Sequence, residues 1–340
     1  MRLNKIASLS AGAALIAATV FSGSAAMAAE TITGTGASYT LSLQTECAAA
    51  YTQHQVTYVS KGSTTGRSDF SKGVSDFGGS DIIYKTSETK PKNFTYVPLL
   101  GGPIAISYNI AGLTRLNLTA AVISDIYLGK ITKWNDAAIV ALNQSSKALL
   151  PDATITPVYR SDGSGTTANF TNYLKQVAGK AWAFSDAFKT AATGVVGVGA
   201  SGNSAVATTI KSTANSFGYI DLADANKNAL PIAHLQNGVK GQFLKPTIAN
   251  SKKFIEATSM KATGEVVFDY NKVLPGAYNL SLVSYGIAPT KAGTAKADAV
   301  REYLTYFIQD CAPSKAAAVG YVALSGKFQT TALKLVSKVD

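Results

Sequence analysis

Hydrophobic positions along this chain follow two different periods, and the two periods alternate from one segment to the next. Runs of apolar and β-branched residues bounded by Gly, Ser and Asp are typical of strands, whereas apolar residues three or four positions apart indicate helices. Because strands alternate with helices, the pattern predicts an α/β fold around a central sheet. Strands or extended segments are predicted at Thr31–Thr33, Val56–Ser60, Ser75–Ser80, Tyr96–Ile110, Thr154–Tyr159, Phe217–Ile220 and Asn279–Ile287. Helices are predicted at Thr40–His54, Leu118–Leu128, Tyr173–Phe188, Ser204–Thr213, Ser251–Ala257 and Ala295–Ile308, with Leu324–Val339 partly helical.

Three of the predicted strands end in turns rich in small polar residues. Gly34–Ser38 follows the first strand, Lys61–Gly66 follows the second, and Ser80 and Asp81 end the third. In open α/β sheets, ligands bind outside the carboxyl ends of the strands. The repeated turns therefore predict a binding site at this edge of the sheet.

A fourth strand end, VYRSDGSGTTANF at 158–170, carries the clearest candidate chemistry. Gly163 and Gly165 allow a tight turn and a close approach of the backbone to a ligand. The helix that follows begins with N–H groups that lack intrahelical partners, and these suit an anion. Arg160 adds a fixed cation that Asp162 can hold in place. The stretch is not a P-loop, because no Lys follows the second glycine. Ser164, Thr166 and Thr167 add hydroxyl groups beside these N–H groups.

Length and composition favour a globular protein with two lobes. The 340 residues are 46% hydrophobic and 15% charged, and a chain of this length divides more readily into two cores than it builds one. No linker separates two halves, so we expect the chain to cross between the lobes more than once. Gly101–Asn109 and Tyr278–Pro289 are the candidate crossings, because both are extended and flanked by Gly or Pro.

The formal net charge is +11. Lysines are scattered without a run of five or more, which argues against an arm that binds nucleic acid. A general positive field attracts small anions. Attraction to an anionic cell envelope and solvated lysines without a role remain alternatives.

The N-terminal segment has the pattern of a cleaved signal peptide at residues 1–28. Arg2 and Lys5 precede the apolar stretch Ile6–Phe21, and Ala26 and Ala28 supply a small-residue cleavage site. We therefore expect an exported protein, located in the periplasm or outside the cell.

Cys47 and Cys311 are the two cysteines of the chain. In an exported protein such a pair is more often a disulfide than a metal site. A bridge would bring both ends of the chain into one lobe; two free thiols are the alternative.

Six motifs follow one another along the chain: GTGAS at 34–38, GSTTG at 62–66, FGGSD at 77–81, DIYLGKITKW at 125–134, RSDGSGT at 160–166 and FGY at 217–219. Together and in this order they resemble the phosphate-binding proteins of bacterial phosphate ABC importers, a family of periplasmic substrate-binding proteins. The resemblance covers nearly all of the chain after the signal peptide. In that family Thr-Phe is common where this chain has Ser38 and Tyr39.

The resemblance implies a two-lobed fold in which each lobe is a central sheet flanked by helices and the ligand lies in the cleft. Lobe I would comprise 29–103 and 284–340, lobe II 108–280, and the hinge crossings 104–107 and 281–283. The implied function is high-affinity binding of inorganic phosphate and its delivery to the membrane subunits of an ABC permease by a monomer, without enzymatic activity, cofactor or metal. The implied phosphate ligands are Ser38, Tyr39 through its N–H, Ser63, Asp81, Arg160, Ser164, Gly165 and Thr166, with Asp162 supporting Arg160.

Asp81 is the informative member of this set, because a carboxylate in an anion site is unfavourable unless the ligand carries a proton. Phosphate carries one near neutral pH, since even a monoester has a second pKa of about 6. Sulfate carries none and would meet an acceptor without a donor. The alternative interpretation of Asp81 is a helix N-cap after a strand.

Other functions remain open from the sequence alone. A secreted phosphatase or serine hydrolase could use Ser164, but its motif is not G-x-S-x-G, and His54 and His234 lie in structural contexts. A binding protein for sulfate or molybdate is a second alternative, against which Asp81 argues. A surface or adhesive protein that retains phosphate binding is a third.

Overall fold

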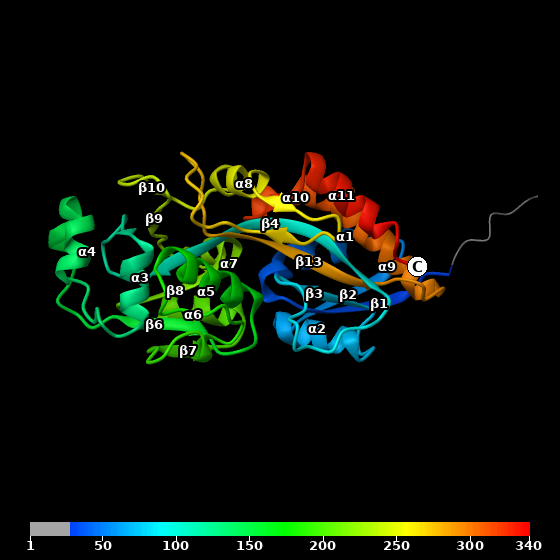
Figure 1. Cartoon of the computed structure of the whole chain (residues 1–340), viewed down its shortest axis with the longest axis horizontal. Helices are drawn as coiled ribbons and strands as arrows, with labels where there is room; N and C mark the ends of the chain where they lie inside the picture. The colour runs from blue at the N-terminus through cyan, green and yellow to red at the C-terminus, as the bar shows by residue number, and fades with distance from the viewer. Residues whose placement is uncertain (1–27) are drawn as a thin grey trace, which may run out of the picture.

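The computed structural model describes residues 28–340, which form an elongated α/β molecule around one mixed sheet (Figure 1). The predicted signal peptide lies outside the described residues apart from its last position. The sheet has nine strands in the order β2-β1-β3-β13-β4-β8-β6-β7, and β14 pairs with β4. The α/β prediction is therefore confirmed.

The sequence order of the elements alternates between strands and helices as expected. The strands of the main sheet are β1 (Thr31–Gly36), β2 (Gln55–Ser60), β3 (Phe77–Ser80), β4 (Phe94–Tyr108), β6 (Thr156–Arg160), β7 (Val198–Ala200), β8 (Ser216–Asp221), β13 (Ser281–Pro289) and β14 (Val322–Ala323). The smaller strands are β5 (Asn117–Leu118), β9 (His234–Gln236), β10 (Phe243–Leu244), β11 (Ser259–Met260) and β12 (Val266–Val267). The α-helices are α1 (Leu41–Ala50), α2 (Ser63–Ser71), α3 (Ala120–Tyr127), α4 (Ala137–Leu142), α5 (Gly165–Val177), α6 (Asn203–Ser212), α7 (Leu222–Lys227), α8 (Ile248–Glu256), α9 (Ala295–Tyr306), α10 (Ala312–Val319) and α11 (Gly326–Val336). Short 3-10 helices lie at Ser38–Thr40, Gln144–Leu149 and Phe188–Thr190, and a π-helical turn spans Phe307–Cys311.

Strand β4 joins the two halves of the molecule. Its first part pairs with β13 as far as Pro103, and its second part pairs with β8 from Ile104 onward. Figure 1 shows β4 and β13 side by side through the middle of the molecule. We call the elements around β1, β2, β3, β13 and β14 lobe I, and the elements around β6, β7 and β8 lobe II. The sheet is continuous from one lobe to the other because both share β4.

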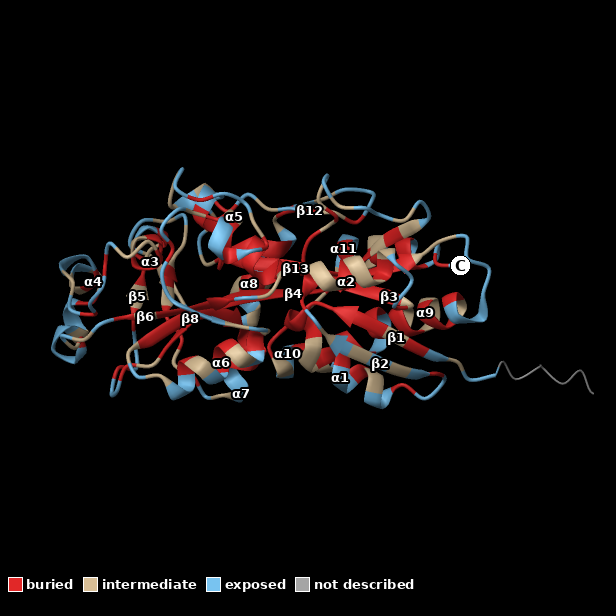
Figure 2. Ribbon diagram, turned by 90° about the horizontal axis from the view of Figure 1, so that it is seen from below, coloured by how far each residue is buried: buried red, intermediate tan, exposed pale blue. Residues whose placement is uncertain are grey.

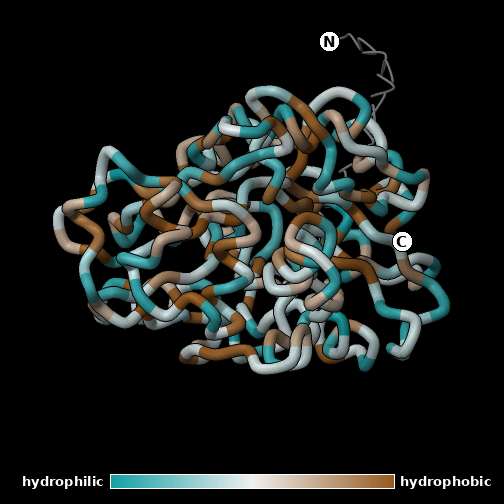
Figure 3. The backbone as a smooth tube through the Cα atoms, turned by 60° about the vertical axis from the view of Figure 1, so that its left-hand side comes forward, coloured by the Kyte–Doolittle hydropathy of each residue, from teal (hydrophilic) through white to brown (hydrophobic). Residues whose placement is uncertain are grey.

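The core lies along this shared sheet. Figure 2 shows its central strands buried and the helices exposed on their outer faces. All but the last residue of β13 are buried, as the run LVSYGIA at 282–288 requires for a strand covered on both sides. Hydrophobic and hydrophilic stretches alternate along the coloured part of the trace in Figure 3. Within residues 28–340, no helix combines the length and the apolar character that a bilayer span needs.

Two predicted helices end earlier than the pattern indicated. Helix α1 stops at Ala50 because Tyr51 is extended, so His54 lies in a bend before β2 rather than at a helix end. The helix predicted at Tyr173–Phe188 is wrong beyond Val177. Gly179 follows with φ of +113°, a left-handed conformation that glycine adopts readily and that ends a helix.

The segment after lobe II returns to pack against lobe I. Helix α8 contacts β4, β13 and β14, and the Val266 N–H donates to the Tyr285 hydroxyl of β13 at 3.0 Å. The hinge crossings at 104–107 and 281–283 and the residue boundaries of the lobes stay predictions. The structure adds that Ile104 and Leu280, at the two crossings, share a backbone hydrogen bond of 2.9 Å.

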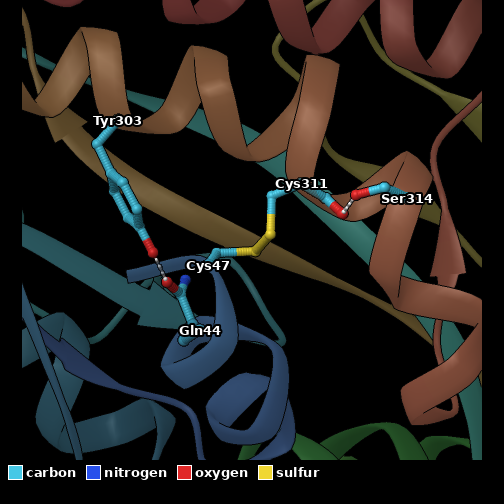
Figure 4. Close-up of a disulfide and its surroundings, with 5 residues drawn as sticks. All are labelled: Gln44, Cys47, Tyr303, Cys311 and Ser314. Atoms are coloured by element: carbon cyan, nitrogen blue, oxygen red, sulfur yellow. Dashed lines mark hydrogen bonds between the residues drawn. A yellow bond between two sulfur atoms is a disulfide. The ribbon is translucent and has the colours of Figure 1, made fainter. Parts of the chain in front are cut away.

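The disulfide between Cys47 and Cys311 is present in the structure and confirms the predicted pairing (Figure 4). It joins α1 to the π-helical turn after α9, with 5.7 Å between the Cα atoms. Beside it the Tyr303 hydroxyl donates to Gln44 Oε1 at 2.7 Å. Both chain ends are thereby held in lobe I.

Replacing both cysteines by alanine should lower the free energy of unfolding by about 2–4 kcal/mol, because the bridge closes a loop of 264 residues in the unfolded chain. Guanidinium denaturation of the oxidised protein and of the Cys47→Ala/Cys311→Ala variant measures the difference. Under reducing conditions the two proteins should approach each other in stability. Equal stability under oxidising conditions would contradict the expectation.

Candidate anion-binding site

Four helical segments begin at one place, at the carboxyl ends of four strands from both lobes. Ser38 begins the first helical turn after β1, and Ser63 begins α2 after β2. Gly165 begins α5 after β6, and Asn203 begins α6 after β7. Each start presents N–H groups without intrahelical partners and the positive end of a helix dipole. The arrangement therefore suits an anion without needing several cations.

Asp81 lies between the two lobes and contacts both. Its Oδ1 accepts a hydrogen bond from Ser284 of β13 at 2.7 Å. Its Oδ2 is 3.4 Å from the hydroxyl of Ser63 in lobe I and 3.4 Å from that of Thr166 in lobe II. The Asp81 main chain is fixed as well, because its C=O accepts from Asn169 of α5 at 2.8 Å. The two 3.4 Å contacts are long, so both hydroxyls can turn toward a ligand.

The pKa of Asp81 is raised to about 6, and burial is the largest cause. The hydrogen bond from Ser284 and the positive charge of Arg160 act in the opposite direction, followed by the hydroxyls of Thr166 and Ser63. Asp81 is 3% exposed and has no cation in direct contact among the described residues. Its carboxylate is thus the least compensated charge of the site.

Arg160, at the end of β6, is held rigidly by two side chains. Its Nε donates to Asp162 Oδ1 at 2.7 Å, a second guanidinium nitrogen donates to the other Asp162 oxygen, and the third donates to Asn203 Oδ1 at 3.0 Å. Burial would raise the pKa of Asp162, but the hydrogen bond and charge of Arg160 hold it below its usual value. A guanidinium has five N–H donors, so these contacts within the described chain leave two for a ligand.

The lobes approach each other too closely at this point for side chains larger than glycine. A Cβ on Gly165 would lie 2.5 Å from Ser63 Oγ and 2.6 Å from Asp81 Cβ. The Thr64 N–H donates to the C=O of Gly163 across the same gap at 3.1 Å. The structure therefore has the two lobes in contact around the predicted ligand residues.

Tyr39 directs its side chain away from the other predicted residues. Its hydroxyl donates to the C=O of Pro103 in β4 at 3.1 Å, and the Tyr321 hydroxyl donates to the Tyr39 C=O at 2.6 Å. Its backbone N–H, which the ligand prediction uses, lies in the first helical turn, Ser38–Thr40. The hydroxyl that distinguishes Tyr39 from a phenylalanine thus connects the turn after β1 to β4, the strand that joins the lobes.

Two residues of the cluster were missed by the sequence analysis. Asn203 donates its N–H to Ser38 Oγ at 3.2 Å while its side chain accepts from Arg160. The glycine-rich turn at 194–202, directly before it, was the signal that could have found it. Ser284 comes from the middle of a buried strand and has no local motif, so only the pairing of β13 with β3 brings it to Asp81.

The eight residues predicted as ligands all line this junction, with Tyr39 set apart by its side chain. Among residues 28–340, no group of three or more His, Cys, Asp or Glu side chains is placed to hold a metal ion. His54 accepts from the Glu30 N–H and contacts Glu302 at 3.0 Å, remote from the site.

The comparisons with known proteins agree on one family. The model of the PBP superfamily domain matches residues 22–310. Phosphate-binding proteins PstS from two strains of Xylella fastidiosa are 34% and 36% identical over 253 and 230 residues, which is 72% and 67% of this chain. The alignments span about two thirds or less, 67% and 61%, of the length of these curated relatives.

Solved structures have the same fold. The high-affinity periplasmic phosphate-binding protein PfluDING, bound with phosphate, superposes with a TM-score of 0.71 at 21% identity and covers 88% of this chain and 92% of its own. The ABC-type phosphate transport receptor from Vibrio cholerae has a TM-score of 0.56 at 20% identity and covers 86% and 99%.

Asp81→Asn should make the ligand-free protein more stable at pH 7. The folded-state pKa of about 6 lies above the unfolded value near 3.9. The free energy of unfolding therefore falls as the pH rises from about 4 to 6, because the buried carboxyl group loses its proton over that range. Removing the charge should raise the free energy of unfolding by on the order of 1–3 kcal/mol at pH 7 and by little at pH 4. Chemical denaturation of phosphate-free protein at both pH values measures this.

Asp162→Asn is the matched control with the opposite sign. Because Arg160 holds the pKa of Asp162 below its usual value, the ionised Asp162 carboxylate stabilises the fold at pH values above that usual pKa. The control should therefore lose stability at pH 7. A loss of stability in both variants would show that Asp81 is not an undercompensated charge.

Proposed function

This chain belongs to the PBP superfamily and, within it, to the phosphate-binding proteins, and we propose that it binds inorganic phosphate for import by an ABC permease. The observation that carries the proposal is the donor set around Asp81 and Arg160. A buried anion requires many donors, because an unpaired charge is very costly inside a protein. One arginine, several hydroxyls and N–H groups at helix starts supply these donors without an excess of positive charge.

The proposed phosphate ligands combine charge-assisted and neutral donors. Arg160 gives its two remaining N–H groups, and each hydrogen bond to a charged group contributes roughly 1.5–3 kcal/mol. The Tyr39 and Gly165 N–H groups complete the set at helix starts. The Ser164 hydroxyl rather than its N–H is proposed as the ligand, since that N–H donates to the Asp186 C=O at 2.9 Å. The hydroxyl donors are Ser38, Ser63, Ser164 and Thr166.

Asp81 accepts the proton of the ligand in this proposal. At neutral pH its pKa of about 6 leaves it mostly ionised, so it can accept a hydrogen bond from a phosphate hydroxyl. Sulfate offers no such hydrogen and would leave a buried acceptor unpaired beside a like charge. Sites built around a ligand hydroxyl reject analogues that lack it by about 10⁴–10⁵-fold.

The two lobes are proposed to open for entry of the ion and to close on it by hinge bending, as periplasmic binding proteins do. The closed form of a monomer would then be recognised by the membrane subunits of the permease. This role places the protein outside the cytoplasmic membrane, in keeping with the predicted signal peptide.

The proposal does not include hydrolysis. The Ser164 hydroxyl oxygen accepts the Thr167 N–H at 3.1 Å as a helix cap, and neither His54 nor His234 contacts it among the described residues. A serine nucleophile needs an adjacent base within hydrogen-bond reach. Incubation with a chromogenic phosphate ester should therefore release no product.

Titration calorimetry with phosphate and sulfate tests the proposal. The wild-type protein should bind phosphate and reject sulfate. Asp81→Asn should weaken phosphate binding but lower the phosphate-to-sulfate affinity ratio by at least about 100-fold, because the amide can donate to sulfate. Asp152→Asn, which removes an exposed carboxylate paired with Lys133, is the charge-matched control and should change neither affinity. Unchanged sulfate rejection in Asp81→Asn would remove Asp81 from this role.

Sulfate binding should also depend on pH. As the pH falls from 7.5 to 5, Asp81 takes up a proton through its pKa of about 6 and becomes a donor. The sulfate affinity of the wild-type protein should therefore increase by nearly tenfold for each pH unit between pH 7.5 and about 6, and should level off at lower pH, where Asp81 is already protonated. The sulfate affinity of Asp81→Asn should stay constant over the same range, and a parallel rise in the variant would contradict the assignment.

A further inference from the structure

Asp186 connects the lobes beside the binding site, although it belongs to no predicted ligand set. It follows α5 in lobe II, and its carboxylate accepts from Thr64 Oγ1 at 2.6 Å, from Arg67 at 2.9 Å and from Lys85 Nζ at 2.8 Å. All three donors belong to lobe I. The Asp186 side chain is 7% exposed, so these contacts replace nearly all of its water.

Arg67 and Lys85, two of the lobe I partners of Asp186, also have hydrogen bonds within lobe I. Glu88 binds Arg67 through two hydrogen bonds of 2.8 and 2.7 Å and also accepts the Lys85 N–H at 2.8 Å. A third Arg67 nitrogen donates to Ser80 Oγ at 2.9 Å. Separation of the lobes would therefore leave Arg67 paired within lobe I, whereas Asp186 would lose every side-chain donor it has in the described chain.

The Asp186 cluster is continuous with the ligand loops. Thr64 directly follows Ser63, and its N–H donates to the C=O of Gly163 in lobe II. On the other side, the Ser164 N–H donates to the Asp186 C=O at 2.9 Å. The two segments that carry proposed phosphate ligands are thus hydrogen-bonded to each other, and one of them is hydrogen-bonded to Asp186 itself.

The carboxylate of Asp186 is well matched to this position. Burial alone would raise its pKa, but hydrogen bonds from Lys85 and Thr64 and the charges of Lys85 and Arg67 hold the pKa below its usual value. Asp186 therefore carries its charge at neutral pH. Removing one partner of such a buried ion pair is costly, because the other charge then stays buried without compensation.

We propose that Asp186 is a positioning residue that holds the lobes closed and thereby sets the rate at which bound phosphate leaves. The inference rests on the proposed function but assigns Asp186 a role separate from ligand recognition. We call these contacts the latch: Asp186 forms its lobe II side, and its lobe I side is formed by Thr64, Arg67 and Lys85.

Stopped-flow release of phosphate, with calorimetry of phosphate and sulfate, tests this role. Asp186→Asn keeps the shape of the side chain and removes its charge. We expect phosphate affinity to fall at least about tenfold, mainly through faster dissociation, because truncating a buried charge pair acts chiefly on the off-rate. The phosphate-to-sulfate affinity ratio should stay within about threefold of the wild-type value. Raised salt should accelerate release from the wild-type protein more than from the variant.

Lys85→Met is the second variant, since Lys85 is half-exposed at the rim and its loss leaves the Arg67–Glu88 pair intact. It should accelerate release in the same direction, and the double variant with Asp186→Asn should fall short of the sum of the two single effects. Asp152→Asn is again the matched control, because it removes one charge of the exposed Lys133–Asp152 pair within lobe II. If Asp186→Asn melts well below the wild-type protein, Lys85→Met decides the outcome.

The results separate this inference from the proposed function. Failure of the wild-type protein to bind phosphate overturns the proposed function, and the latch with it. Phosphate binding by the wild-type protein together with an unchanged off-rate in folded variants overturns the latch alone. A changed phosphate-to-sulfate ratio in Asp186→Asn would also overturn it, because Asp186 would then act in recognition.

Discussion

Burial of charge where the two lobes meet is the constraint on which this structure depends. Arg67, Arg160, Asp81 and Asp186 are all nearly excluded from water, and an unpaired ion there would cost several kcal/mol. Direct partners decide how well each carboxyl group is compensated. A direct arginine or lysine holds the pKa of Asp162 and of Asp186 below the usual range, whereas the pKa of Asp81, whose close partners are hydroxyls, is raised. The least compensated group is thus the one that faces the proposed ligand.

Helix starts and glycines provide the rest of the site because they supply donors without adding charge. Further cations in their place would offset the repulsion between the Asp81 carboxylate and an unprotonated anion, and would thereby weaken the selectivity proposed for Asp81. Glycine at 165 lets the first turn of α5 reach Ser63 and Asp81 across the lobe boundary, where any Cβ would collide. Small residues at the strand ends therefore have two effects: they leave backbone N–H groups accessible as donors, and they let the two lobes come into contact.

Most of this candidate site could be predicted from local sequence, because each predicted ligand loop joins one strand to one helical segment and needs only nearby residues to form. The alternation of strands and helices predicted the α/β fold for the same reason, and the cysteine pair predicted the contact between the chain ends. What the sequence could not supply were partners brought in by distant pairing. Ser284 reaches Asp81 through the register of β13 with β3, and Asp186 reaches Thr64 only because the lobes meet. The end of α5 was also missed, since the apolar pattern continues past Val177 and only the left-handed Gly179 breaks the helix.

In the proposed function, recognition by Asp81 and closure by the Asp186 cluster are chemically distinct, but both contribute to the same free energy of closure. Because contact between the lobes buries Asp81, the desolvation of that carboxylate would oppose closure without a ligand. Contacts that need no ligand must offset this cost, and the Asp186 cluster and the Thr64–Gly163 hydrogen bond are contacts of that kind. A stronger latch would favour closure on an empty site, whereas a weaker one would let the ion escape. The Asp186 cluster must therefore be strong enough to retain the ion but weak enough that the desolvation of Asp81 still prevents closure on an empty site.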